Sequence, residues 1–302
     1  NLDSASGRRF GFELTFFRFA LTPVAPAGGS DWLTNQVYIA HLALTDARGE
    51  RFLVDERFSR GALGLAGAEA DPFRVWIDDW SIAAQPGAGT RWTLSAASDD
   101  FSLDLDLEAL KPPALNGDAG LSQKSDKPGN ASYYYSITRW ATDGRVTLGD
   151  ERFDVSGLAW LDREWSSSAL DDQQQGWDWF ALQLDDGSEL MVYNLRRTDG
   201  SQDSNSAGTF VAADGRYEHL VAADIRIRVT GSWDSPEGGR YPSRWTVDVP
   251  RLGVSLDVEP VIADQELFTT VRYWEGAVDV TGLRNGDRLE GRGYVELTGY
   301  AD

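Results

Sequence analysis

Two carboxylates and an indole are closely spaced in the segment GLAWLDREWSS, residues 157–167. If this segment is a strand, its side chains alternate between two faces, so that Trp160, Asp162 and Glu164 share one face. A rise of roughly 3.3 Å per residue then places the two carboxylates about 6–7 Å apart, beside the indole. The spacing brings together groups that could transfer a proton.

The chemistry expected of this face is proton donation by Asp162, assisted by Glu164. A carboxyl group in an aromatic pocket tends to have a raised pKa, because desolvation disfavours its charged form. Once protonated, it can protonate an alkene, an ether or a glycosidic oxygen. The alternative is structural: Arg163, or another arginine such as Arg139, neutralises one of the two carboxylates and closes the end of a barrel.

Aromatic residues surround these carboxylates in the sequence. Tyr133 and Tyr135 would share one face of the preceding strand, and Trp177 and Trp179 one face of the following strand. The chain contains 12 tryptophans, so core packing alone is a strained account of them. Rings of this kind suit a flat apolar ligand or a sugar, and the alternative is that they fill a barrel core.

The predicted ligand contacts are therefore aromatic side chains, including Trp160, together with Arg139 and His41. His41 lies in the apolar segment YIAHLAL and is predicted to be a core histidine with one satisfied hydrogen bond. His219 is the second of two histidines, and there is no cysteine, which nearly excludes a zinc site built from His and Cys. The proton chemistry expected at Asp162 needs no metal and no cofactor.

Other reaction classes lack their sequence motifs. The chain has no Gly-x-Ser-x-Gly elbow, no phosphate loop and no Gly-x-Gly-x-x-Gly. The net charge of −20 disfavours nucleic acid and anionic lipid head groups as partners. No apolar run approaches the roughly 18–20 residues of a transmembrane segment. A hydrophobic small molecule is the expected partner, and no pattern in the sequence specifies an oligomeric state.

The elements that must position these residues are strands. Alternating segments rich in aromatic and aliphatic residues occur along the whole chain, and Gly or Asp-Gly turns separate many of them. Only residues 57–70 suggest a short helix, and their glycines weaken that prediction. The clearest predicted strands are 9–19, 36–44, 91–96, 101–110 and 225–233. The chain is therefore predicted to be all-β and antiparallel, with a barrel-like fold.

An internal repeat suggests that this fold is duplicated. The sequence GFELTFF begins at Gly11 and the similar GSELMVY at Gly187. Likewise, TRW at 138–140 leads to GLAWLD at 157–162, and RYW at 272–274 leads to GRGYVE at 291–296. Because these landmarks occur twice in the same order, two tandem antiparallel barrels are expected.

The expected domain boundary falls in the polar stretch SSSALDDQQQ, so the predicted domains are residues 1–170 and 171–302. Within the first of them, residues 107–132 are rich in Gly, Pro, Ser and Asp and show little periodicity. A loop of this length is either a functional lid or binding loop, or a surface insertion.

Six segments together resemble the AttH-like proteins, a family often described as predicted secreted hydrolases. They are FGFELTFFRF, NQVYIAHLALTD, ASYYYSITR, GLAWLDREWSS, GWDWFALQLDDG and GRGYVELTGY, which run from residue 9 to residue 300. The family is distantly similar to hydroxyneurosporene synthase, a carotenoid 1,2-hydratase. The resemblance implies two lipocalin-like barrels of the calycin type, a ligand region at or between them, an upstream segment before Asn1, and a periplasmic or secreted location.

In the carotenoid hydratases, an aspartate two residues after an aromatic residue is the proposed acid, and Trp160 and Asp162 match that pattern. A histidine follows the aspartate there, whereas Arg163 stands here. Three functions stay open: binding or acid-assisted hydration or cyclisation of an isoprenoid-like lipid, binding or processing of a glycan, and a non-catalytic carrier or scaffold.

Overall fold

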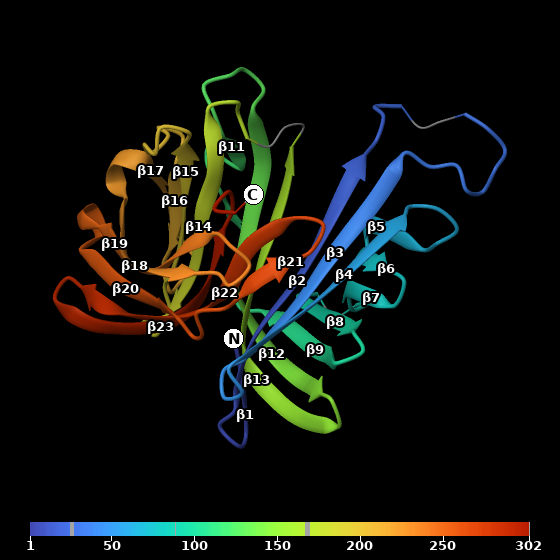
Figure 1. The fold of residues 1–302 in the computed structure, drawn as a ribbon, viewed down its shortest axis with the longest axis horizontal. Coiled ribbons are helices and arrows are strands. Elements are labelled where there is room, and N and C mark those ends of the chain that lie inside the picture. The colour runs from blue at the N-terminus through green and yellow to red at the C-terminus, as the bar shows by residue number, and fades with distance from the viewer. Residues whose placement is uncertain (25–26, 88, 167–169, 302) are drawn as a thin grey trace. The chain divides into compact units, whose positions relative to one another are not determined.

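The computed structural model describes residues 1–24, 27–87, 89–166 and 170–301. Within these ranges the chain forms 23 strands and two single-turn 3-10 helices, and no α-helix (Figure 1). The all-β prediction is confirmed. The helix suggested at residues 57–70 is wrong, because the end of one strand, a turn and the start of another occupy this segment.

Two compact units divide the chain, and they are interleaved in the sequence. One comprises Asn1–Ala109 and Ala141–Leu158, and the other Leu110–Trp140 and Ala159–Asp302. The interleaving arises because two long strands, β12 (Ala131–Leu148) and β13 (Glu151–Ser166), have residues in both units. The polar stretch SSSALDDQQQ instead predicts a single division of the chain, after residue 170. Residues 167–169 of the predicted boundary stretch lie outside the described residues.

The first unit is one curled antiparallel sheet. Its strands besides β12 and β13 are β1 (Leu2–Ser4), β2 (Arg9–Ala20), β3 (Gln36–Asp46), β4 (Arg51–Arg60), β5 (Ala66–Ala70), β6 (Phe73–Ile77), β7 (Trp80–Ala84), β8 (Arg91–Ala97) and β9 (Phe101–Ala109). Their order is β4-β3-β2-β1-β13-β12-β9-β8-β7-β6-β5. The β5–β6 end contacts β3 and β4, so the sheet encloses a core that includes Phe10, Leu42, Trp80 and Leu103.

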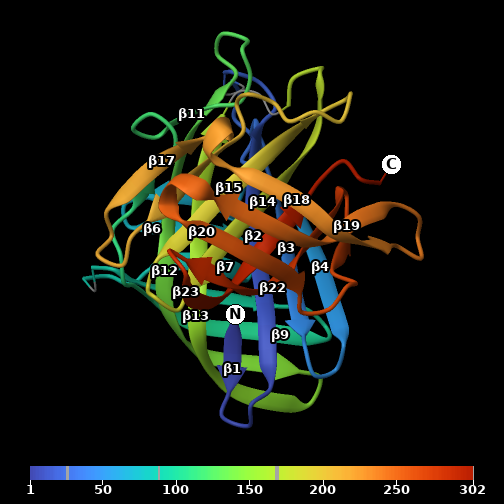
Figure 2. The ribbon, with the colours of Figure 1, turned by 90° about the vertical axis from the view of Figure 1, so that its left-hand side faces the viewer.

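The second unit is a nearly closed barrel, seen in Figure 2 with β18, β19, β20 and β22 side by side. Its strands and turns are β10 (Ala114–Leu115), β11 (Leu121–Gln123), β14 (Gln174–Leu184), β15 (Glu189–Arg197), β16 (Ala207–Val211), β17 (Tyr217–Val221), η1 (Ala222–Asp224), β18 (Arg226–Asp234), β19 (Arg240–Val249), η2 (Pro250–Leu252), β20 (Val254–Pro260), β21 (Glu266–Phe268), β22 (Arg272–Arg284) and β23 (Asp287–Leu297). The order is β17-β16-β15-β14-β23-β22-β20-β19-β18. Large apolar side chains such as Phe180, Trp245 and Trp274 fill the interior.

The two units repeat the same strand order. The path β4-β3-β2-β1-β13-β12-β9-β8-β7 in the first unit corresponds, strand for strand, to the nine-strand path of the second. The landmarks of the sequence repeat fall on equivalent elements, since β12 and β13 carry the first pair and β22 and β23 the second. The duplication predicted from the repeat therefore appears in the topology.

Strands β14 and β15 bury both of their faces. Phe180 and its partner Val192 point into the barrel core. The neighbouring pair, Trp179 and Tyr193, points outward into a second apolar cluster. Side chains of β12 and β13 cover this outer face, and the strands β10 and β11 pair with β12. The long segment at 107–132 thus contains two short strands of the second unit.

Substitution of Trp245 tests the filled interior of the barrel. Trp245 is 1% exposed and packs against Phe180 and Trp274, with ring centroids 5.5 and 6.3 Å away. Trp245→Ala should lower the free energy of unfolding by about 3–5 kcal/mol, measured by chemical denaturation, because it leaves a cavity. Trp32→Ala is the control, since Trp32 is 53% exposed. Equal losses in the two variants would contradict the packed core.

Candidate functional site

The carboxylate of Asp162 accepts hydrogen bonds from three side chains of the second unit. Its Oδ1 accepts from Ser136 Oγ at 2.5 Å and from Trp160 Nε1 at 2.8 Å, and its Oδ2 accepts from Tyr134 Oη at 2.6 Å. Trp160 shares a face of β13 with Asp162, as the alternation of side chains predicts. Tyr134 and Ser136 come from β12 and were not predicted.

Two N–H groups fix the direction of the hydroxyl donors. The Trp179 indole donates to the Tyr134 hydroxyl at 3.1 Å, and the Asn116 amide donates to Ser136 Oγ at 2.9 Å. An indole N–H is a donor only, so the Tyr134 hydroxyl must accept there and is left to donate to Asp162. The Asn116 amide is oriented in turn, because its oxygen accepts from Thr209 at 2.7 Å. Asp162 is therefore surrounded by donors that point toward it.

Burial raises the pKa of Asp162 to about 6, although the three donors act to lower it. The nearby charge of Glu164 raises this pKa further. Burial and the same carboxylates hold the pKa of the Tyr134 hydroxyl well above its ordinary value. Asp162 is thus the group of this site that exchanges a proton near neutral pH.

Asp162 differs from the fully buried carboxylates of the unit in that its hydrogen-bond donors are uncharged. Glu189 pairs with Arg139 at 2.5 Å, Glu266 with an arginine at 2.7 Å, and Asp178 with another at 3.0 Å. None of the three donors to Asp162 carries a charge. The alternative in which an arginine neutralises Asp162 is therefore not what the structure shows.

Glu164, the second predicted carboxylate, lies on the same strand face but has a different environment. Its Oε1 lies 2.8 Å from the Lys124 ammonium and accepts a short hydrogen bond from Ser132. Its side chain is 41% exposed. The ion pair expected of this face thus forms at Glu164, with a lysine that the sequence analysis did not single out.

An aromatic cluster adjoins the carboxylate. Tyr134 belongs to it, and its partly buried members include three predicted ligand contacts, Trp160, Trp177 and Trp179. The rings of Trp160 and Trp179 meet edge to face, with centroids 6.5 Å apart. The structure brings these tryptophans together with Asp162, outside the barrel core.

Tyr133 and Tyr135 lie elsewhere. They occupy the face of β12 opposite Tyr134, where both rings contact Trp165, with centroids 5.9 and 6.3 Å away. Arg163 donates to the Tyr135 hydroxyl at 3.3 Å. The expectation that these two tyrosines surround Asp162 is corrected by the alternation of β12, which turns Tyr134 toward the carboxylate instead.

The remaining predicted contacts are engaged with other carboxylates. Arg139 bonds to Glu189 and to the carbonyl oxygen of Leu184. His41 belongs to the first unit, is 1% exposed, and its Nε2 lies 3.0 Å from Glu56 Oε1. This is the environment expected of a core histidine.

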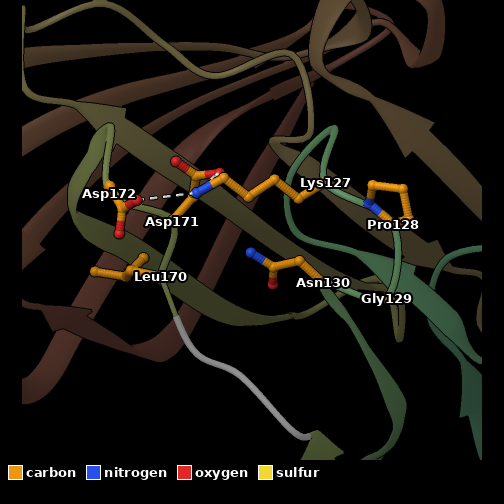
Figure 3. Close-up of a pocket in the computed structure, with 7 residues that line it drawn as sticks. All are labelled: Lys127, Pro128, Gly129, Asn130, Leu170, Asp171 and Asp172. Carbon is orange, nitrogen blue, oxygen red and sulfur yellow. Dashed lines mark hydrogen bonds and ion pairs between the residues drawn. The ribbon is translucent and has the colours of Figure 1, made fainter.

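A hollow of about 400 Å³ borders the aromatic cluster. Residues 127–130 and 170–172 line it (Figure 3). Lys127 crosses it to Asp171 and Asp172, at 3.2 and 3.1 Å. Leu170 forms part of its wall and also packs against the aromatic cluster, so this side chain connects the hollow to those rings.

The described residues contain no group of three or more His, Asp or Glu side chains placed to hold a metal ion. Within the same ranges, no helix is long and apolar enough to cross a membrane.

Fold and site together define an all-β, lipocalin-like protein. On the outer face of one barrel it holds a partly buried carboxylate whose hydrogen-bond donors are all uncharged. The AttH-like family profile matches residues 1–300, and the chain belongs to that family. An AttH protein from Nitrosomonas europaea is 32% identical, with a TM-score of 0.86 over 100% of this chain and 90% of that one. Kievitone hydratase from Nectria haematococca shares the fold at 14% identity, with a TM-score of 0.77 over 99% and 87% of the two chains. Among curated proteins, none matches the sequence.

The pKa of Asp162 predicts how its contribution to stability depends on pH. In the folded protein it is about 6, above the ordinary value of 3.8, so the folded state holds this proton more tightly than the unfolded chain does. The stabilisation is complete below about pH 4 and is lost as the pH rises through about 6, by up to about 3 kcal/mol. The unfolding free energy of the parent minus that of Asp162→Asn should fall by this amount across that range. A difference that does not vary with pH would contradict the assignment.

Proposed function

We propose that the protein binds a hydrophobic, isoprenoid-like small molecule and catalyses acid-assisted hydration or cyclisation of an alkene, with Asp162 as the proton donor. The observation that carries this proposal is the environment of Asp162, a partly buried carboxyl with uncharged donors and a pKa of about 6, when the fully buried carboxylates Glu189, Asp178 and Glu266 of the same unit are paired with arginine. A group that must change its protonation state cannot be tied to a permanent cation, because the cation would hold it ionised.

The proton balance follows from the hydrogen bonds. Oδ1 accepts two hydrogen bonds, from Ser136 and Trp160, whereas Oδ2 accepts one, from Tyr134, so the acidic hydrogen is placed on the second lone pair of Oδ2. Transfer of this proton to an alkene carbon forms a C–H bond and leaves a tertiary cation. In hydration, water then forms the C–O bond and its proton returns to the carboxylate. In cyclisation, a second double bond supplies the electron pair for a C–C bond, and the new cation loses a C–H proton to the carboxylate to give a C=C bond. The π faces of Trp160, Trp177 and Trp179 would stabilise the cation.

The similarity to a hydratase supports the reaction class only through the shared fold. Glu164 acts in this proposal through its charge, since it is held by Lys124. A periplasmic or secreted location is also part of the proposal and rests on the family. No cofactor or metal takes part in the proposed steps.

Asp162→Asn should abolish turnover. With a panel of terminal isoprenoid alkenes in ¹⁸O-labelled water, mass spectrometry should detect labelled alcohols, or cyclised isomers, formed by the parent protein. The variant should be at least about 100-fold slower, because general acid catalysis contributes this much. The parent rate should fall as the pH rises through about 6.

Asp257→Asn is the matched control. Asp257 is an exposed aspartate on β20 of the second unit, whereas the proposed site is built from β12, β13 and β14. It should retain the parent rate. Retained turnover in Asp162→Asn, or an equal loss in both variants, would refute Asp162 as the acid.

A second candidate function is glycan binding, and the exposed face of β12 and β13 favours it. Tyr133 and Trp165 are 58% and 53% exposed, and their rings lie 33° from parallel. The Arg163 guanidinium lies 6.0 Å from the Trp165 ring centroid. Exposed rings with a neighbouring fork of N–H donors suit the apolar face and hydroxyls of a sugar.

Trp165→Ala should test this surface. On an array of neutral glycans, the variant should lose at least about fivefold in affinity for any glycan that the parent binds, since stacking on an aromatic ring is worth about 1 kcal/mol or more. Trp32→Ala, which removes an equally exposed tryptophan from the first unit, should bind as the parent does. Unchanged binding in Trp165→Ala would exclude this surface.

A further inference from the structure

Lys124 is fixed from several sides in the second unit. It follows β11, and its ammonium lies 2.8 Å from Glu164 Oε1. The same nitrogen lies 4.4 Å from the ring centroid of Tyr193 and 5.2 Å from that of Tyr134. Its carbonyl oxygen accepts a hydrogen bond from Gln174 at 2.7 Å. With 16% of its side chain exposed, this lysine is held much more tightly than a surface lysine.

These contacts connect Lys124 to Asp162 by two paths. Tyr134, whose ring lies near the ammonium, donates its hydroxyl proton to Asp162. Glu164, the ion-pair partner of Lys124, lies two residues from Asp162 on the same strand face. Its negative charge raises the pKa of Asp162. Without a cation here, two carboxylates about 6–7 Å apart would compete for one proton.

We infer that Lys124 is a positioning residue that neutralises Glu164 and holds it apart from Asp162, so that Asp162 alone takes up the proton of this site. The inference deepens the proposed function, because it explains how one of two neighbouring carboxylates becomes the acid. It does not depend on the identity of the substrate.

A purely structural role for Lys124 would be to pin the segment 110–130 to the barrel. Other contacts already do this: Ser122 Oγ lies 3.0 Å from the Tyr193 hydroxyl, and Asn116 bonds to Thr209. Lys111 bonds to Glu189 at 2.7 Å. Because these bonds do not involve the Lys124 ammonium, its charge can be removed while the segment stays attached.

The titratable and charged groups that face Asp162 among the described residues come from four elements. They are Tyr134 of β12, Glu164 of β13, Lys124 after β11, and Tyr193 of β15. The Tyr134 phenol stays neutral at the pH values that matter, because burial and the neighbouring carboxylates raise its pKa well above its ordinary value. Lys124 and Glu164 are therefore the charges that can change the proton affinity of Asp162.

The experiment is an NMR titration of protein labelled with ¹³C at the aspartate carboxyl carbons, with Asp162→Asn used to assign the signal. Lys124→Met keeps the aliphatic contact with the rings and removes the charge. It should raise the titration midpoint of Asp162 by on the order of one pH unit, because unpaired Glu164 repels the ionised form. The double variant with Glu164→Gln should return toward the parent midpoint, and Lys124→Arg should preserve it.

Glu164→Gln alone should lower the midpoint, and this variant keeps the test decisive if Lys124→Met fails to fold. An unchanged midpoint in folded Lys124→Met would overturn the inference. So would a raised midpoint that persists in the double variant, because it would show that packing, and not charge, is responsible.

The titration also separates this inference from the proposed function. If the predicted shifts occur but no alkene turns over, the inferred role of Lys124 stands and the catalytic proposal fails. If turnover depends on Asp162 but its midpoint is the same with and without the Lys124 charge, the catalytic proposal stands and the role of Lys124 is refuted.

Discussion

The site depends on strands β14 and β15 burying both of their faces. A barrel strand usually has one face in the core and one toward solvent, but here Phe180 and Val192 fill the interior while Trp179 and Tyr193 face outward into a second cluster. The barrel interior is packed with fully buried side chains, whereas the outer cluster includes rings that are only partly buried. Asp162 lies against that outer face, and its surroundings can vary without loss of the barrel core.

The second constraint is electrostatic. Burial of a carboxylate is costly unless its charge is compensated, and most buried acids of this unit are compensated by arginine. Asp162 is compensated by dipoles alone, and these are oriented by further N–H groups from Trp179 and Asn116. Dipoles stabilise the ionised form of Asp162 less strongly than a cation would, so its protonated, neutral form is easier to populate. The nearby cation, Lys124, forms its ion pair with Glu164 instead.

The sequence predicted the strands, the repeated order and the shared face of Trp160, Asp162 and Glu164, because these follow from local alternation. It did not predict Tyr134, since three consecutive tyrosines do not show which of them faces the carboxylates. A regular hairpin with Gly149 and Asp150 as its two-residue turn would place Asp162 opposite Ile137, on the face of Tyr133 and Tyr135. The bonds from Tyr134 and Ser136 show that the register changes by an odd number of residues, as a β-bulge does. Asn116 and Lys124 were missed because their contacts are not local.

The strands shared by the two units have a consequence for how the chain can be assembled. Residues 110–140 of the second unit are made before residues 141–158 of the first, and both long strands pass from one unit to the other. Each sheet is nevertheless complete within one stretch of the chain, since strands β1–β13 form the first and strands β14–β23 the second. The backbone pairing of the first sheet can therefore be finished before residues 174–297 are made, although β12 and β13 also contribute side chains to the second compact unit.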